Sequence, residues 1–432
     1  MITFDEEVCH KDMLKTLYTM STFVLFLFIV LNLINPYSPI ITIGFNLLLL
    51  IFLNKSVPYS TSSLLYKSIL IYSIIICIWA FFVMVVNFNI NLYIAIKYLR
   101  MPITTWLIFN IIKYSAYTPT QLVKCIFFIG VINLVVIVLE LVVPSTRDII
   151  AGFIGISRMD AASYFDYRVL GITGSFEFCS ILVTILMYIL FLYYSRKRNF
   201  LYLPLILITY ASLIFVSRTG MLFGAIILIY ILGKLLKISR SFHKVFILVI
   251  ISCAFALIGY TILPILINSS GLFETQMETT HMLDLGTDYG SGTASALTSG
   301  EHLNILKEPF VDQIIGYGIN SEDFLEKKIS TDIGYLEFVC HIGFIGLSFI
   351  IFMHLKILSS TILIQKSLTD SSNYFQITTK QIGEIIIFYI IMLFAFNYKL
   401  MLMYSRGTYD FMLILVFSFF KFYKLNKCNN YG

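Results

Sequence analysis

Apolar runs long enough to cross a lipid bilayer recur along nearly the whole sequence. A hydrocarbon core of about 30 Å requires about 20 consecutive apolar residues in a helix. The chain has 432 residues, of which 59% are hydrophobic and only 12% are charged, whereas soluble proteins carry roughly 25% charged residues. Because a helix satisfies its own backbone groups in lipid, the sequence predicts an all-α polytopic membrane protein.

The runs predict twelve transmembrane helices within a single integral membrane domain, 1–432. The expected ranges are 14–33, 38–53, 65–86, 92–112, 121–143, 175–194, 199–216, 219–236, 245–267, 334–355, 382–399 and 408–423. The first thirteen residues carry mixed charges and show no signal-peptide cleavage site, so the first run is expected to remain as a span.

Lys and Arg are distributed unevenly between the two sides of these spans. With the N-terminus in the cytosol, nineteen of the thirty lie on the inner side and nine on the outer side. Positive charge accumulates on the cytosolic side of membrane proteins, so both termini are expected there. The remaining two, Lys97 and Arg100, fall inside the fourth span. They are expected either to pair with Glu140 or to line a path for lipid.

Two predicted outer segments are long, 144–174 and 268–333. The first balances three arginines with three aspartates, and the second has eleven acidic residues against three lysines. Loops of this length are usually functional or disordered. A short helix lying on the membrane is expected within the second, over 301–310.

Several signatures of other protein classes are missing from the sequence. It contains no GxxxxGK[ST], no HExxH and no Asp-x-Asp, and its seven cysteines show no metal-ligand spacing. The sequence therefore lacks the signatures of an ATP-driven pump, a zinc protease and a metal-assisted nucleotide-sugar transferase. No cofactor, metal or nucleic-acid partner is expected.

Four arginines are expected on the outer side, against the usual trend. Arg218 lies in VSRTGML between two apolar runs, Arg158 and Arg168 lie in the first long segment, and Arg406 lies in YSRGTYD. Each could simply end a helix and extend to the interface. Guanidinium groups also bind phosphate oxygens in pairs, so a convergent set would suit an anionic lipid-linked headgroup such as a pyrophosphate.

Three phrases resemble the O-antigen polymerase and O-antigen ligase superfamily. They are RVLGITGSF leading into a span, SLIFVSRTGML between two spans, and IGYGIN followed by STDIGYLEFVCHIGFIG leading into a late span. With the span count and the long outer loops, the resemblance covers most of the chain. It implies a C-type membrane glycosyltransferase that joins oligosaccharide repeat units carried on undecaprenyl pyrophosphate, with inversion and without a metal. The family works at the outer face of the bacterial inner membrane.

The resemblance also implies roles for particular residues. Arg168 matches the arginine before a glycine-rich entry into a span, and Arg218 matches the arginine of the SR[TS]G turn. Asp332 stands where the ligases carry the histidine of a His-Asn-x-x-Leu pattern, and this departure favours a polymerase over a ligase. Membrane lipids are further expected partners, and the resemblance also implies a chain-length regulator.

The reaction needs donors for the departing phosphate and a base for the acceptor hydroxyl. Arg168, Arg218 and Arg406 are the candidates for binding the pyrophosphate, and Asp332, Glu301 and His302 are the candidates for the base. Asp332 could instead cap the following helix, and Glu301 and His302 could be solvated loop residues. A flippase or transporter of lipid-linked sugars, or an O-antigen ligase, are the alternative functions.

Overall fold

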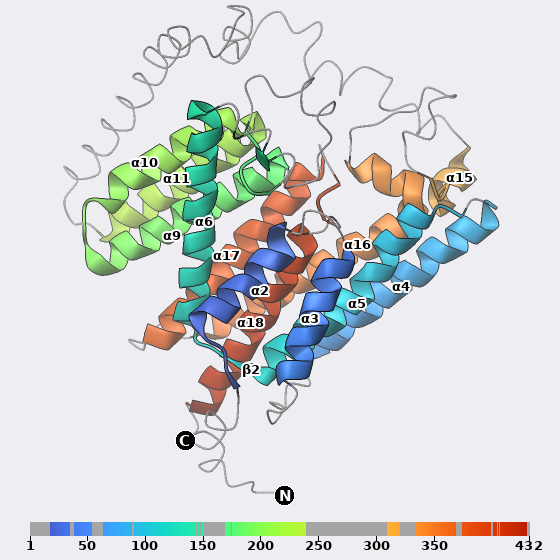
Figure 1. The fold of residues 1–432 in the computed structure, drawn as a ribbon, viewed down its shortest axis with the longest axis horizontal. Coiled ribbons are helices and arrows are strands. Elements are labelled where there is room, and N and C mark those ends of the chain that lie inside the picture. Colours follow the sequence, from blue (N-terminus) through green and yellow to red (C-terminus); the bar gives the residue numbers. More distant parts are fainter. Residues whose placement is uncertain are drawn as a thin grey trace, which may run out of the picture. The chain divides into compact units, whose positions relative to one another are not determined.

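The computed structural model describes residues 18–34, 39–53, 64–88, 90–143, 146, 149–150, 169–173, 175–238, 309–319, 334–368, 374–398, 401–403, 405 and 407–429. These residues are mainly helical (Figure 1). The chain divides into two compact units. Unit 1 comprises Met1–Cys125 and Gly290–Gly432, and unit 2 comprises Ile126–Tyr289.

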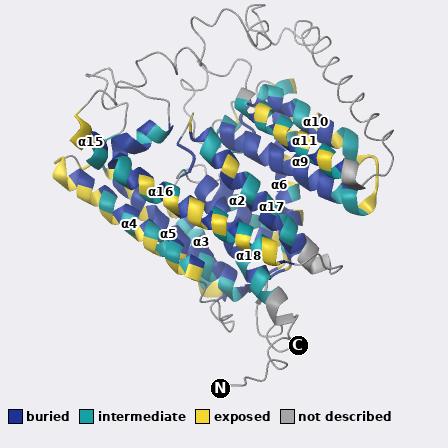
Figure 2. Cartoon of the chain, turned by 180° about the vertical axis from the view of Figure 1, so that it is seen from behind, coloured by how far each residue is buried: buried dark blue, intermediate teal, exposed yellow. Residues whose placement is uncertain are grey.

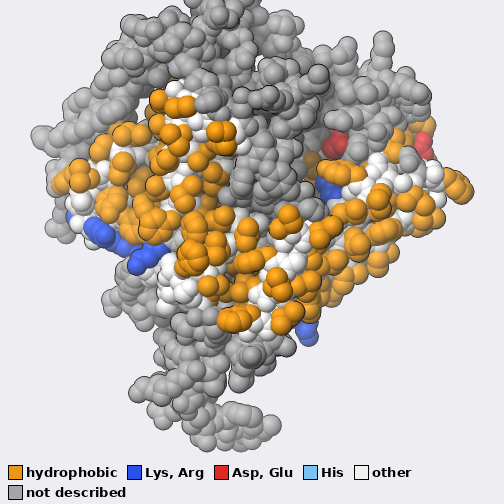
Figure 3. All heavy atoms as spheres, viewed as in Figure 1, with side chains coloured by type: hydrophobic (Ala, Val, Ile, Leu, Met, Phe, Trp, Pro, Cys, Tyr) orange, Lys and Arg blue, Asp and Glu red, His pale blue; other side chains and the backbone are white. Residues whose placement is uncertain are grey.

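Among the described residues, five helices are long and apolar enough to cross a membrane. They are Leu64–Val86, Pro119–Val142, Phe176–Lys197, Gly334–Ser367 and Thr378–Phe396, and shorter apolar helices accompany them. Hydrophobic side chains predominate among the described residues on the face shown in Figure 3. The prediction of an all-α membrane protein is therefore confirmed, whereas the number of spans stays a prediction.

Unit 1 is a set of packed helices with one small sheet. Helix α5 (Leu92–Tyr114) packs against α3 (Pro39–Leu53), α4 (Leu64–Val86) and α18 (Thr408–Asn429). Helix α16 (Gly334–Ser367) packs against α4, α15 (Phe310–Ile315) and α17 (Tyr374–Phe396). Helix α18 is buried along most of its length, whereas α4 exposes apolar side chains (Figure 2). The remaining described elements of this unit are β1 (Tyr18–Thr19), α2 (Thr22–Ile34) and β2 (Ser115–Ala116).

Unit 2 is built around α9 (Phe176–Lys197), against which both α10 (Tyr202–Ser212) and α11 (Arg218–Ile238) pack. A short 3-10 turn, η1 (Leu213–Phe215), joins α10 to α11. Helix α6 (Pro119–Val142) begins in unit 1 and continues into unit 2. Side chains are buried along nearly all of α9, which explains why its apolar run is almost continuous.

Capping residues mark the first turn of several helices, close to where the apolar runs begin in the sequence. Thr118 and Gln121 form a reciprocal capping box before α6: Gln121 Oε1 accepts from the Thr118 N–H at 2.8 Å and Thr118 Oγ1 accepts from the Gln121 N–H at 3.2 Å. Pro119 occupies the first helical position, where its missing N–H costs nothing. The side chains of Asn91 and Ser175 cap α5 and α9 by accepting from backbone N–H groups of the first turn.

The first predicted span, 14–33, starts too early. Tyr18 and Thr19 pair in parallel with Ser115 and Ala116, and the Met20 N–H donates to the Ala116 carbonyl at 3.0 Å. Because this backbone is bonded to another segment, α2 begins only at Thr22.

Helix α16 is longer than the predicted span 334–355 and is broken. It has 34 residues, and Gly343 within it has a φ of 65° and a ψ of −179°. The N–H groups of Tyr317 and Gly318 donate to the Cys340 carbonyl at 2.8 and 3.1 Å. The indole N–H of Trp79 donates to the Ile342 carbonyl at 2.8 Å. The carbonyls released by the break are thus satisfied, as burial in an apolar region requires.

Other boundaries differ by smaller amounts. Helix α17 begins at Tyr374 and ends at Phe396, earlier than the predicted 382–399. Most of the short helix expected over 301–310 lies outside the described residues; the described helix in this part of the chain is α15 (Phe310–Ile315). The predicted ninth span, 245–267, and most of the two long outer segments lie outside the described residues.

Candidate functional site

Five ionisable side chains from three helices gather in unit 1. They are Lys97 and Arg100 on α5, Glu337 and His341 on α16, and Asp410 on α18, and we refer to them as the charge cluster. Ionisable groups in apolar helices are costly, so they normally pair with one another and mark functional positions. The charge cluster is therefore a candidate functional site of unit 1.

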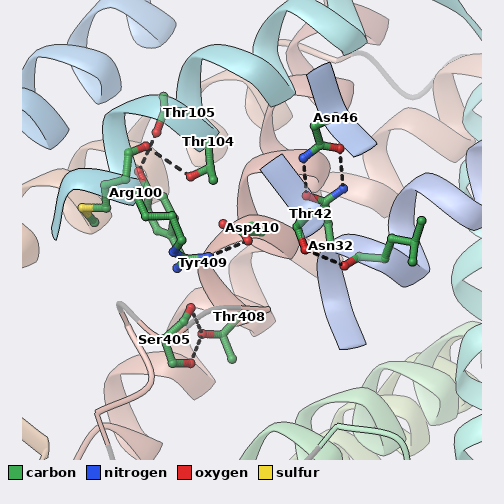
Figure 4. A network of polar contacts seen from close by, with 12 residues as sticks. Asn32, Thr42, Asn46, Arg100, Thr104, Thr105, Ser405, Thr408, Tyr409 and Asp410 are labelled. Carbon is green, nitrogen blue, oxygen red and sulfur yellow. Dashed lines mark hydrogen bonds and ion pairs between the residues drawn. The ribbon is translucent and has the colours of Figure 1, made fainter. Parts of the chain in front are cut away.

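Arg100 and Asp410 form a buried ion pair at the centre of Figure 4. The guanidinium Nη1 lies 2.8 Å from Asp410 Oδ2, and the two side chains are 5% and 0% exposed. The sequence suggested Glu140 as one possible partner of Lys97 and Arg100, whereas the carboxylate that Arg100 contacts within unit 1 is Asp410. Glu140 belongs to unit 2, where its Oε2 accepts from the Leu170 N–H at 2.9 Å.

The same region contains a second layer of hydrogen bonds. Thr105 and Tyr409 join α5 to α18 through hydroxyls 2.9 Å apart, and Asn32 and Asn46 join α2 to α3 through reciprocal amide bonds of 3.1 and 2.8 Å (Figure 4). Each of these groups is buried and satisfied. They hold the helices around the ion pair in one arrangement.

Glu337, His341 and Tyr98 form a short chain of polar groups. Glu337 Oε1 lies 3.1 Å from His341 Nε2, and His341 Nδ1 lies 3.3 Å from the Tyr98 hydroxyl. Both ring nitrogens of the imidazole are therefore engaged. An imidazole held between a carboxylate and a hydroxyl can accept or pass on a proton. The Glu337 side chain is 18% exposed, so it is the accessible end of this chain.

Lys97 links α5 to the segment after α17. Its ammonium donates to Met401 Sδ at 2.8 Å and lies 5.9 Å from the centre of the Tyr93 ring. A thioether is a weak acceptor. A phosphate or sugar oxygen would be a stronger partner for this ammonium.

Hydrogen bonds hold several described residues between α17 and α18. Asn397 Oδ1 accepts from the N–H groups of Leu402 and Met403 at 2.9 and 3.1 Å. The hydroxyls of Ser405 and Thr408 are 2.7 Å apart (Figure 4). Described residues on both sides of Arg406 in the sequence therefore have defined hydrogen bonds.

In unit 2 a backbone hydrogen bond joins the two sequence phrases that carry arginines. The Val169 N–H donates to the Phe215 carbonyl at 3.0 Å. Val169 follows Arg168 directly in the sequence, and Phe215 precedes Arg218 by three residues. The two phrases, distant in sequence, therefore meet within one unit.

The turn that follows Val169 is held by buried side chains. Asn133 Oδ1 accepts from the Ile172 N–H at 3.0 Å, and Glu140 accepts from the Leu170 N–H. Gly171 has a φ of +59°, and a Cβ there would lie 2.3 Å from Asn133 Oδ1. Gly171, the first glycine of RVLGITG, is thus favoured for two reasons: its positive φ suits glycine, and the Asn133 amide leaves no room for a side chain.

Two residues of the phrase VSRTGML determine how α11 begins and how closely it packs. Ser217 Oγ accepts from the Gly220 N–H at 3.3 Å and so caps the helix. A Cβ on Gly220 would lie 2.3 Å from Ser180 Oγ, so the glycine lets α11 approach α9 closely. Arg218 is the first residue of α11, and its side chain lies outside the described residues.

The other predicted site residues also lie outside the described part of the chain. These are Arg168, Arg406, Asp332, Glu301 and His302. Their described neighbours are Val169, Ser405 with Gly407, and Gly334 at the start of α16. The roles proposed for the five residues stay predictions.

Glu337 and Asp410 are the members of the charge cluster that sequence reasoning missed. The available signals were an acid four residues before a histidine in GYLEFVCHIGFIG, and an acid opening the apolar run TYDFMLILVFSFF. Among the described residues, no group of three or more His, Cys, Asp and Glu side chains is arranged to hold a metal ion.

Neither a protein-family model nor a curated protein matches the chain. Inferences about its function therefore rest on its own residues and their geometry.

Proposed function

We propose that the chain is a membrane glycosyltransferase that polymerises oligosaccharide repeat units carried on undecaprenyl pyrophosphate, as an O-antigen polymerase does. The observation that carries the proposal is the hydrogen bond from Val169 to Phe215. It joins the phrases of Arg168 and Arg218 in a chain whose apolar helices belong in a membrane. A guanidinium group carried by each of these phrases would suit a pyrophosphate.

The proposed reaction is an inverting displacement at the anomeric carbon. A sugar hydroxyl of the acceptor attacks that carbon, the bond to the pyrophosphate oxygen breaks, and undecaprenyl pyrophosphate leaves with the electron pair. Arg168, Arg218 and Arg406 stabilise the charge that develops on the leaving group. The acceptor proton passes to Asp332, with Glu301 and His302 as the other candidates. The leaving group already carries the activation, so the step requires no further cofactor.

The proposed setting is the outer face of a bacterial inner membrane. Twelve spans of the C-type architecture and two cytosolic termini would place both arginine phrases on that face. The Glu337–His341 pair lies near the start of α16, the helix that follows Asp332 in the sequence. A proton accepted by Asp332 would be followed in the sequence by two side chains that can bind protons, Glu337 and His341.

A transporter or flippase of lipid-linked sugars is the second candidate. The charge cluster and the break in α16 at Gly343 favour it, because intramembrane charges and discontinuous helices are typical of transport pathways. An O-antigen ligase would share the chemistry of the polymerase and differ only in the acceptor.

Purified protein in liposomes, supplied with undecaprenyl-pyrophosphate-linked repeat units, distinguishes the three. A polymerase should give a ladder of lipid-linked chains, a ligase should transfer single units to a lipid A-type acceptor, and a flippase should move the lipid between leaflets without forming a bond. Arg218→Lys should lose most of the ladder, because lysine lacks the planar fork of arginine. A full ladder from Arg218→Ala would remove Arg218 from the pyrophosphate site.

A further inference from the structure

Lys97 is the cation of the charge cluster that lacks a bonded carboxylate within the described part of the chain. Arg100 is paired with Asp410, whereas Glu337 is paired with His341 and attracts Lys97 without forming an ion pair with it. The Lys97 ammonium donates to the Met401 thioether at 2.8 Å. An ammonium has three donors and a thioether is a weak acceptor, so Lys97 retains donors for an anion.

Lys97 is also more accessible than Arg100. The Arg100 side chain is 5% exposed, whereas Lys97 is partly exposed and lies in the second turn of α5. The predicted topology places this end of α5 on the outer side. A lysine that only reaches for water extends away from the protein, but Lys97 lies against the segment between α17 and α18. Its ammonium is thus held in place and remains open to a ligand.

Asn397 provides a second donor beside the same segment. Its Oδ1 accepts from the N–H groups of Leu402 and Met403, next to Met401, and these two bonds fix which amide atom is the oxygen. The side chain is fully buried, and its Nδ2 has no hydrogen-bond partner among the described residues. Buried donors normally have an acceptor. Residues 401–403 therefore adjoin one ammonium and one amide that both lack an oxygen acceptor.

The same region adjoins two of the predicted site residues in the sequence. The segment that Lys97 contacts leads to Arg406, five residues after Met401. The start of α16 reaches it through Tyr335, whose hydroxyl donates to a carbonyl in the last turn of α17 at 2.6 Å. Tyr335 follows Asp332 by three residues. Unit 1 thus brings Lys97 to the segments that flank a candidate phosphate ligand and a candidate base.

We propose that Lys97 is a further substrate-binding residue, whose ammonium contacts a phosphate oxygen of the lipid-linked pyrophosphate. Lysine binds phosphate as a point charge. Beside Lys97, α5 exposes Tyr93 and Ile96, which offer an apolar surface to the prenyl chain. This inference rests on the proposed function, from which it takes the pyrophosphate lipid.

Binding to the purified full chain in a neutral detergent tests the inference without requiring polymerisation. Undecaprenyl pyrophosphate, undecaprenol, phosphatidylglycerol and inorganic pyrophosphate are titrated separately by native mass spectrometry. We expect undecaprenyl pyrophosphate to bind most tightly, because it alone combines a pyrophosphate with a prenyl chain. Equally tight binding of phosphatidylglycerol would indicate a general site for anionic lipids and would overturn the inference. Displacement of the lipid by equimolar inorganic pyrophosphate would indicate a site for a free anion and would also overturn it.

Variants assign the binding to Lys97. Lys97→Gln should weaken binding of undecaprenyl pyrophosphate roughly 10- to 100-fold, as loss of a charged hydrogen bond does, and should leave undecaprenol unaffected. Lys97→Arg keeps the charge and should keep most of the affinity. Lys356→Gln is the matched control, because Lys356 is an exposed lysine in a separate groove beside Tyr72 and Phe352. Unchanged affinity in Lys97→Gln, or an equal loss in Lys356→Gln, would contradict the assignment.

Amine labelling of the unaltered chain gives an answer even if Lys97→Gln does not fold. Undecaprenyl pyrophosphate should slow acetylation of Lys97 but not of Lys356, and undecaprenol should slow neither. Equal protection of Lys97 by the two lipids would overturn the inference. Protection of Lys97 in a chain that forms no ladder would uphold the inference and exclude the polymerase. A ladder formed by a chain whose Lys97 stays unprotected would uphold the polymerase and overturn the inference.

Discussion

Arg100 brings a full positive charge into the apolar interior of unit 1, and Asp410 compensates it across a distance of 2.8 Å. Burying two charges is costly, so such a pair adds little net stability compared with apolar residues. Removing one partner is far worse, because the other charge is left uncompensated. The main effect of the pair is therefore to specify how α5 packs against α18. Its net contribution to the free energy of unfolding is small.

Asp410→Asn should destabilise the protein by about 3–5 kcal/mol. The combined change Arg100→Met and Asp410→Leu should recover most of the loss, because no charge then remains buried. Thermal unfolding of purified protein in one detergent measures both. Asn110→Ala is the control, since Asn110 is on α5 and donates to Trp106 of its own helix at a more exposed position. A single variant as stable as the unaltered protein would show that the guanidinium finds another partner.

Asp332 is tested by replacing its carboxylate with an amide. Asn caps a helix about as well as Asp, so Asp332→Asn should be nearly harmless if the residue is only a cap. If it is the base, the amide cannot take the acceptor proton, and we expect turnover to fall roughly 10²–10⁴-fold. The measurement is polymerisation in vitro by proteins with matched melting temperatures. Unchanged turnover would exclude Asp332 as the general base and leave Glu301 and His302 as the candidates.

Helix α16 shows how one residue shapes a whole element. Gly343 has a φ of 65°, a conformation that other residues rarely adopt, and it ends the helical run that began at Gly334. Gly316, directly after α15, packs so closely that a Cβ on it would lie 2.3 Å from the Gly343 nitrogen. The break therefore creates the position at which α15 docks.

Gly343→Ala should destabilise unit 1. The left-handed backbone costs about 1–3 kcal/mol for a residue with a side chain, and the new Cβ would lie 2.2 Å from the Ile314 carbonyl oxygen. Gly233→Ala is the matched control on α11, since a Cβ there meets nothing within 4 Å. That change should raise stability by roughly 0.5–1 kcal/mol. Equal effects of the two substitutions on the melting temperature would contradict the account of the break.

At the scale of the whole molecule, the charge asymmetry predicts which segments face outward. Ser291→Cys and Ser157→Cys lie in the predicted outer segments, and Ser367→Cys lies at the end of α16 predicted to be cytosolic. An impermeant thiol reagent should label the first two in intact spheroplasts and the third only after lysis.

The background for this labelling can keep four native cysteines. Cys77, Cys125, Cys179 and Cys340 are buried, so an impermeant reagent should not reach them, and only the other three need replacement. Protection of Ser291→Cys in intact spheroplasts, together with labelling of Ser367→Cys, would reverse the predicted topology.

Continuous apolar runs by themselves determined the helices. Eleven of the twelve predicted ranges contain a helix in the described residues, because hydrophobic length is a local property of the chain. Local signals also set several starts, as at the capping box of Thr118 and Gln121. The sequence likewise singled out Lys97 and Arg100, since charges inside such runs are conspicuous.

Tertiary structure alone decided which of these groups meet. Arg100 and Asp410 are 310 positions apart, and no local pattern distinguishes Asp410 from Glu140 as the partner. Two further features depend on segments distant in the sequence. One is the strand pair that precedes α2, and the other is the docking of α15 at Gly343. Periodicity describes the face of one helix, whereas an ion pair or a broken helix depends on which helices pack together. That packing is set by the whole chain.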